Sequence, residues 1–192
     1  RFENFGNNLK TVGWGNKKDQ LLRFEVLFRN LNPTGKTILD VGCGLGHLVD
    51  FLVDKTDNNF QYTGIDIAEN LVNEARKNYE SKNIKFINCD VFSIDDKFDI
   101  VVVSGAFSHK TYNIIDYTHK SIKKMYDISS ESVCVNFLSK YVDYELEKNQ
   151  HYYPQELYSE IKKYCDKIVI IDDYPLYEFT LQLKKKYYGN KK

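Results

Sequence analysis

The chain's clearest candidate for binding chemistry is a glycine-rich segment that directly follows a strand-like run. It covers residues 40–46 and reads D-V-G-C-G-L-G. Glycines at a strand-to-helix turn let a ligand approach the backbone where a Cβ would clash, and the helix beyond aims unpaired N–H groups at that ligand. Asp40 precedes the turn, and a carboxylate there suits a cationic amino group better than a pyrophosphate. The segment therefore predicts a site for a ligand with a cationic group.

The spacing of the glycines argues against a dinucleotide. The dinucleotide fingerprint is G-x-G-x-x-G, but here the third glycine, Gly46, comes one residue early and His47 holds the later position. The chain also lacks an obvious Tyr-x-x-x-Lys in a suitable place. An NAD(P)-dependent oxidoreductase is therefore the less favoured alternative.

Three further polar segments stand where later strands are expected to end. Asp66 ends a second strand, where a carboxylate can accept hydrogen bonds from ribose hydroxyls. Asp90 and Val91 follow a third strand and suit an adenine amino group and its ring. Ser104 and Gly105 follow a fourth. Because ligands of open α/β sheets bind at the carboxyl ends of the strands, all four segments predict one site.

The elements that must position these residues alternate between strand-like and helix-like patterns, which is typical of an α/β fold. Strands are predicted at 36–41, 61–66, 84–88, 98–103, 132–137, 167–171 and 177–183, and helices at 18–29, 46–55, 69–81, 113–126 and 154–164. The last two strands are too close in sequence for a parallel crossover, so they must be antiparallel.

Together the motifs resemble the class I S-adenosylmethionine-dependent methyltransferases. The matching stretches are T-I-L-D-V-G-C-G-L-G-H-L, Y-T-G-I-D-I, I-K-F-I-N-C-D-V-F and F-D-I-V-V-V-S-G-A-F, in the family's order, within residues 36–137. The G-W-G at 13–15 and the D-Y-P-L-Y-E-F at 173–179 are similar to a bacterial subset of small methyltransferases. The resemblance implies a Rossmann-like, mostly parallel seven-stranded sheet in the order 3-2-1-4-5-7-6. Only strand 7 is then antiparallel, and helices cover both faces.

The resemblance also implies the cofactor, S-adenosyl-L-methionine, with S-adenosyl-L-homocysteine as its product. By the family pattern, Asp40, Gly42 and Gly44 hold the methionine end, within a cofactor-binding loop that also contains Cys43 and Gly46.

The same pattern assigns the rest of the cofactor to residues beyond this loop. Asp66 is expected to hold the ribose, and Ile67 to lie against the adenine. Asp90 and Val91 complete the adenine pocket.

The methyl group and its acceptor are expected near the end of the fourth strand. Ser104 and Gly105 lie there by the family pattern, and His109 follows a few residues later as the candidate general base for an oxygen acceptor. A surface-loop histidine is the alternative reading of His109. Trp14, in its glycine-flanked loop, is expected to close over the cofactor as a lid or to anchor the N-terminal helix.

Aromatic and polar residues of the less diagnostic segments are candidates for the substrate cleft. They are Phe107, His151, Tyr152, Tyr153 and Tyr174. After the fourth strand many N-methyltransferases carry Asn/Asp-Pro-Pro-Tyr/Phe, whereas this chain has S-G-A-F. That departure disfavours a DNA adenine or a protein glutamine as the acceptor.

Composition narrows the substrate further. The 192 residues suit one compact domain, which we divide into an N-terminal helical and lid segment, 1–35, and a methyltransferase domain, 36–192. Basic and acidic side chains are equal at 27 each, whereas nucleic-acid binders usually show a basic excess. We therefore expect no nucleic-acid partner, and methylation of an oxygen or nitrogen of a small polar metabolite. A non-catalytic S-adenosylmethionine-binding or scaffold module is the alternative.

The remaining features predict neither a metal nor a membrane partner. The four cysteines are far apart, which argues against zinc or a disulfide framework and indicates a reducing, cytoplasmic compartment. The acidic pairs 95–96 and 172–173 are interpreted as turns. No apolar run reaches the roughly 18 residues of a membrane span, and no signal peptide is visible. The sequence leaves the oligomeric state open.

Overall fold

One mixed sheet organises the computed structural model, which describes residues 16–185. The strands are β1 Thr37–Val41, β2 Gln61–Asp66, β3 Ile84–Asn88, β4 Phe98–Val103, β5 Ser129–Ser139, β6 His151–Tyr152, β7 Lys167–Ile171 and β8 Glu178–Lys184. The helices are α2 Lys17–Leu27, α3 Leu48–Thr56, α4 Glu69–Tyr79, α5 Ile114–Ile128 and α6 Pro154–Ile161, with short 3₁₀ turns η1 Val91–Ser93 and η2 Ala106–Ser108.

The order of the strands confirms the predicted topology. It is β3-β2-β1-β4-β5-β8-β7, and β8 is antiparallel to both of its neighbours while the other pairs along this path are parallel. This is the predicted order, with β8 as strand 7 and β7 as strand 6. The short strand β6, which pairs with β5, was not predicted.

Most element boundaries differ from the prediction by one to three residues, and two of these differences bear on the site. Strand β5 runs from Ser129 to Ser139, longer at both ends than 132–137. Helix α3 begins at Leu48 and not at Gly46. The reason is local, because Gly42, Gly44 and Gly46 all have positive φ, a conformation that cannot continue as a right-handed helix.

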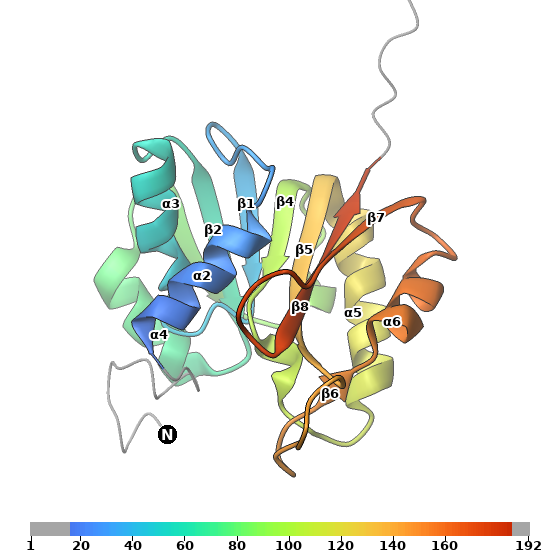
Figure 1. The fold of residues 1–192 in the computed structure, drawn as a ribbon. Coiled ribbons are helices and arrows are strands. Elements are labelled where there is room, and N and C mark those ends of the chain that lie inside the picture. The colour runs from blue at the N-terminus through green and yellow to red at the C-terminus, as the bar shows by residue number, and fades with distance from the viewer. Residues whose placement is uncertain (1–15, 186–192) are drawn as a thin grey trace, which may run out of the picture.

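Both faces of the sheet are buried beneath helices (Figure 1). Along β4, Val101 and Val103 pack in the cluster that includes α5 and α6, whereas Ile100 and Val102 pack in the cluster that includes α2, α3 and α4. This two-sided burial explains the unbroken apolar run of β4, since a parallel strand covered on both faces needs no polar side. It also opens only the strand ends to a ligand.

Helix α2 packs into the same core as the sheet. Its end contributes Phe24 and Leu27 to the cluster that contains β1 and α3. Gln182 of β8, 2% exposed, donates hydrogen bonds from Nε2 to the carbonyls of Leu27 and Arg29 at 3.0 and 2.9 Å. The last strand therefore fixes the end of the first described helix. Across residues 16–185 no helix is long and apolar enough to cross a membrane.

Candidate active site

A cavity of about 1010 Å³ opens where β1, β2 and β4 end. It lies at the point where the strand order reverses, because β2 and β4 flank β1 on opposite sides. Its volume is at the upper end of the range of roughly 300–1,000 Å³ for small-molecule sites. The wall combines the loops after four strands with side chains from α2, α5, β5 and β8.

The glycine loop is shaped by close contacts. A Cβ on Gly42 would lie 2.5 Å from the Cβ of Ala106 in the loop after β4, and Gly42 has φ +75°. A Cβ on Gly46 would lie 2.8 Å from the ring of Phe86. Gly42 lines the cavity, and Gly46 does not. Gly46 therefore serves the packing of the loop on β3 and does not face the ligand space.

Asp40 is buried at the bottom of the cavity. Its side chain accepts a hydrogen bond at Oδ2 from the Tyr62 hydroxyl at 2.7 Å, while Oδ1 has no partner among the side chains and backbone of residues 16–185. Burial raises the pKa of Asp40 to about 7, against the lowering effect of the Tyr62 bond. A buried carboxylate oxygen with no partner costs free energy, so a cationic donor in the cavity is its natural complement.

Asp66 ties the glycine loop to the end of β2. Its Oδ2 accepts from the Gly44 amide and its Oδ1 from the Ala68 amide, both at 2.9 Å. Each carboxylate oxygen keeps a second lone pair for a ligand hydroxyl. The neighbouring Ile67 is 76% exposed and lines the cavity, an apolar side chain left open to whatever the cavity holds.

Asp90 caps η1 and is joined by a tyrosine that sequence reasoning missed. Its Oδ1 accepts from the Phe92 amide at 2.9 Å, and its Oδ2 accepts from the Tyr117 hydroxyl at 2.6 Å. Burial and this bond raise the pKa of Tyr117 to about 12, so the phenol stays a donor at neutral pH. Val91, 1% exposed, lines the cavity beside them.

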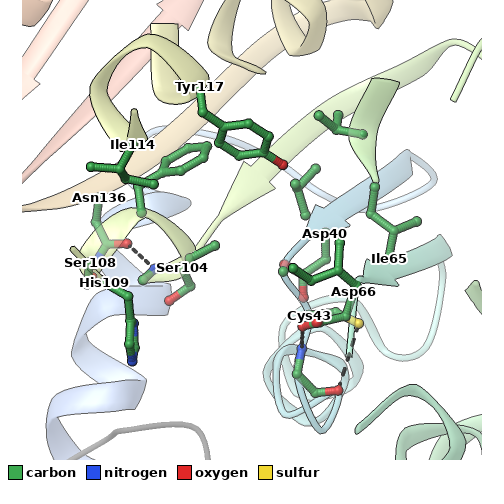
Figure 2. A pocket seen from close by; sticks show the side chains of 18 of the residues that line it. Asp40, Cys43, Ile65, Asp66, Ser104, Ser108, His109, Ile114, Tyr117 and Asn136 are labelled. Carbon is green, nitrogen blue, oxygen red and sulfur yellow. Dashed lines mark hydrogen bonds between the residues drawn. The ribbon is translucent and has the colours of Figure 1, made fainter. Parts of the chain in front are cut away.

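Ser104 and Gly105 form the opposite wall. Figure 2 shows Ser104 across the cavity from Asp40, Cys43 and Asp66. Gly105 has φ +80°, and its amide donates to Asn136 Oδ1 at 2.9 Å. The Ser104 hydroxyl oxygen is buried without a hydrogen-bond partner in the described part of the chain. Both residues thus face the same space as Asp40.

His109 lies on the rim of the cavity, where two loops meet. Its backbone bridges to Asn149. The Lys110 amide donates to the Lys148 carbonyl at 2.9 Å, and the Gln150 amide to the Ser108 carbonyl at 3.0 Å. These bonds bring Asn149 and Lys148, which also line the cavity, beside the histidine.

Among the predicted cleft residues only Phe107 lines the cavity. Tyr152 is buried beside Phe107, and its hydroxyl donates to the Phe107 carbonyl at 3.1 Å. His151 is buried too, and its Nδ1 lies 2.7 Å from the Ser139 carbonyl. The unpredicted strand β6 accounts for both positions, because it draws these residues into the sheet beside β5.

The other two candidates also lie outside the cavity lining. Tyr153 packs its ring against Tyr141, away from the cavity. Tyr174 is 7% exposed and its hydroxyl lies 3.1 Å from Thr180 Oγ1. Tyr174 instead packs in a small apolar cluster with Val26 and Ile171. Trp14 lies outside the described residues.

Comparison with known proteins decides the class of this site. A family model described as a methyltransferase domain matches residues 32–188. The chain belongs to this methyltransferase family. The enzyme is 32% identical over 157 residues to Rv1506c of Mycobacterium tuberculosis, whose name assigns it provisionally to the methyltransferases. That match covers 78% of this chain and 93% of the relative.

Two further comparisons concern the fold and a part of the sequence. The magnesium protoporphyrin IX methyltransferase of Synechocystis PCC 6803, solved with S-adenosylhomocysteine bound, superposes with a TM-score of 0.68 at 15% identity, covering 92% of each chain. A shorter match of 81 residues, at 32% identity, reaches the ribosomal RNA small subunit methyltransferase A of Mesomycoplasma hyopneumoniae. It covers 42% of this chain and 30% of that protein.

The methyltransferase uses S-adenosylmethionine, and the residues present fit it. The partnerless oxygen of buried Asp40 complements the ammonium of its methionine end. Exposed Ile67 and buried Val91 offer apolar contact to a ring. When bound, the cofactor supplies a methyl carbon activated by a sulfonium.

Proposed function

We propose that this methyltransferase transfers the methyl group to an oxygen or nitrogen of a small polar metabolite. The observation that carries the proposal is the cavity of about 1010 Å³, whose lining combines the expected cofactor residues with the rim loops. Its lining includes Asp66 and Asp90 of the expected cofactor site, and also Tyr112 and Lys148. A cavity of this size suits a cofactor together with one small acceptor.

The acceptor half is built by the loops 108–113 and 146–149. It offers hydrogen-bonding side chains, among them His109, Thr111 and Asn149, beside the apolar Leu138 and Leu146. Such a lining, apolar with a few polar groups, is typical of sites that orient a small molecule. The equal numbers of basic and acidic residues also support a metabolite over a nucleic acid.

The reaction needs little covalent chemistry from the protein. A lone pair of the acceptor forms the new bond to the methyl carbon, the carbon–sulfur bond breaks, and the acceptor loses a proton. The chain's contribution is to hold the two reactants in line and to exclude water. We assign His109 as the base that takes the proton of a hydroxyl acceptor.

An acceptor screen tests the proposal. Purified enzyme is incubated with methyl-labelled S-adenosylmethionine and separate pools of small hydroxyl acids, sugars, amines, ribosomal RNA and protein. We expect label in a small-molecule pool. Label confined to RNA or protein would contradict the metabolite assignment, whereas cofactor binding without turnover in any pool would favour the scaffold alternative.

A further inference from the structure

A chain of buried hydrogen bonds runs from helix α2 to the wall of the active site. Arg23 donates from Nε to both carboxylate oxygens of Glu178, each at 2.8 Å, and also from Nη2 to Oε1. Glu178 Oε2 accepts from Asn136 Nδ2 at 2.9 Å. Asn136 Oδ1 accepts from the Gly105 amide at 2.9 Å. Three separate elements, α2, β8 and β5, thus converge on one peptide group.

The side chains that make these hydrogen bonds are buried, so the series of bonds is not a surface feature. The side chains of Arg23 and Glu178 are 11% and 5% exposed, and Asn136 is 3% exposed. A buried ion pair adds little stability over apolar side chains of similar volume, because desolvation offsets the attraction. Stability alone therefore does not explain why charged side chains occupy this place.

The location of these side chains explains why polar and charged groups occur here. Arg23, Asn136 and Glu178 all line the cavity. The series of hydrogen bonds ends at Gly105, which has a left-handed backbone conformation and lines the cavity in the loop after β4. Across the cavity from Ser104 stands Asp40 (Figure 2), the expected partner of the cofactor's methionine end. That end of the cofactor is therefore expected between Asp40 and the Ser104–Gly105 backbone.

We propose that Arg23, Glu178 and Asn136 form a positioning network that holds the Ser104–Gly105 backbone against the methionine end of the cofactor. This proposal rests on the proposed placement of that end beside Ser104 and Gly105. Asn136 acts through the Gly105 peptide, and the ion pair acts by fixing the orientation of the Asn136 amide. The network needs no contact of its own with the transferred methyl.

Two ligands that differ only at the methionine end test the network. S-adenosylhomocysteine carries the amino-acid part, and 5′-methylthioadenosine shares the adenosine and the sulfur but lacks it. Calorimetry on the full chain is expected to show Asn136→Ala weakening S-adenosylhomocysteine at least tenfold and 5′-methylthioadenosine less than twofold. The matched control is Asn83→Ala, at the other end of the sheet, whose amide donates to the Phe60 carbonyl and accepts from Ser81. It should change neither affinity.

Exchanging the amide at position 136 with the carboxylate at position 178 is expected to restore cofactor binding. In the double variant Asn136→Asp with Glu178→Gln, the new carboxylate accepts from the Gly105 amide and from the amide nitrogen at position 178. Arg23 keeps its bonds to the remaining oxygen at position 178 and loses the one to the other oxygen. The link from Arg23 to Gly105 is thus rebuilt with the same total charge. We expect its S-adenosylhomocysteine affinity within threefold of the wild type. A folded Asn136→Ala variant that binds S-adenosylhomocysteine as the wild type does, or that loses both ligands equally, overturns the proposal.

A second route covers the case in which Asn136→Ala does not fold. Arg23→Met with Glu178→Leu replaces the ion pair by apolar side chains, a change that folds in comparable buried pairs. It leaves Asn136 without its acceptor, so we expect faster amide hydrogen exchange at Gly105 and weaker S-adenosylhomocysteine binding. Unchanged values for both overturn the network. If the wild-type enzyme bound neither ligand, the cofactor assignment itself would fail instead.

Discussion

At the residue scale, Asp40 combines a structural cost with the role in cofactor binding that we propose for it. Its carboxylate is buried with one oxygen unpartnered in the described chain, and its pKa is raised to about 7, chiefly by burial. The unfolded chain releases this proton near the ordinary value of 3.8. Between these two pH values the folded state therefore holds the extra proton, and folding stability falls as the pH rises.

The first prediction follows from that shift. Between about pH 4 and pH 7 the ligand-free protein should lose stability, and Asp40→Asn, which cannot ionise, should lose less over the same range. Urea denaturation at several pH values measures the difference. Parallel curves for the two proteins would show that Asp40 is not buried as a protonated group. The same variant should bind S-adenosylhomocysteine more weakly at pH 8, where the wild-type carboxylate is charged.

His109 provides the second prediction. If it removes the acceptor's proton, His109→Gln should lower kcat by about 10²–10⁴-fold, the usual contribution of a general base. Its side chain is placed on the rim and not in the cofactor loop, so S-adenosylhomocysteine affinity should stay unchanged. Turnover of the screened acceptor with saturating cofactor measures kcat. A variant that retains full turnover would return His109 to the surface-loop reading.

At the element scale, sequence patterns located every described strand except β6, because each of the others contains an apolar or β-branched run of its own. The I-V-V-V run of β4 and the polar residues that follow the strands can be recognised from the local sequence alone, without knowing which segments they contact. The polar Asn136 inside the buried strand β5, and Glu178 within the D-Y-P-L-Y-E-F segment, were the available signals of further site residues. Their meaning depends on Arg23, which lies 155 positions from Glu178 in sequence, and no local pattern reports such a pairing.

Contacts between distant segments also explain why most of the predicted cleft residues lie outside the cavity lining. Tyr152 was expected in the cleft from its polar aromatic surroundings, but the pairing of β6 with β5 buries it. Tyr117 was missed because only the packing of α5 beside η1 brings its hydroxyl to Asp90. Residue types indicated which side chains could take part in chemistry, but tertiary contacts determine which of them face the cavity.

The glycine loop gives the third prediction. Gly42→Ala places a Cβ 2.5 Å from Ala106 and strains a left-handed residue, and the strain alone costs about 1–2 kcal/mol. Gly35→Ala is the matched control, because Gly35 has φ +72° with no atom within 4 Å of its Cβ position. We expect Gly42→Ala to lower the free energy of unfolding by more than Gly35→Ala and to weaken cofactor binding. Equal losses in denaturant titrations would mean that the loop yields to the new methyl group.

At the scale of the whole molecule, the cavity joins the two halves of the sheet. Its wall takes residues from both ends of the described chain, such as Arg23 and Glu178, and from the strands between them. A ligand in this cavity is therefore expected to stabilise the fold as a unit, because it binds the folded state alone.

The fourth prediction is the size of that effect. At a concentration of 100 times its Kd, S-adenosylhomocysteine should add about 2.7 kcal/mol to the free energy of unfolding. For a chain of this size that corresponds to a rise in Tm of about 5–11 °C. Scanning calorimetry measures it, with NAD as the control ligand. A comparable rise with NAD would contradict the reading of the glycine spacing.

The antiparallel strand β8 has a consequence for how the protein is made. It lies between β5 and β7, although β7 precedes it in the chain. During synthesis β7 has no place in the sheet until β8 emerges, and Arg23 meets Glu178 only then. Until that moment the nascent chain exposes the unpaired edge of β5, a template for pairing with other chains. Ribosomes that stall before residue 178 would therefore release a product prone to aggregation, with an incomplete active site.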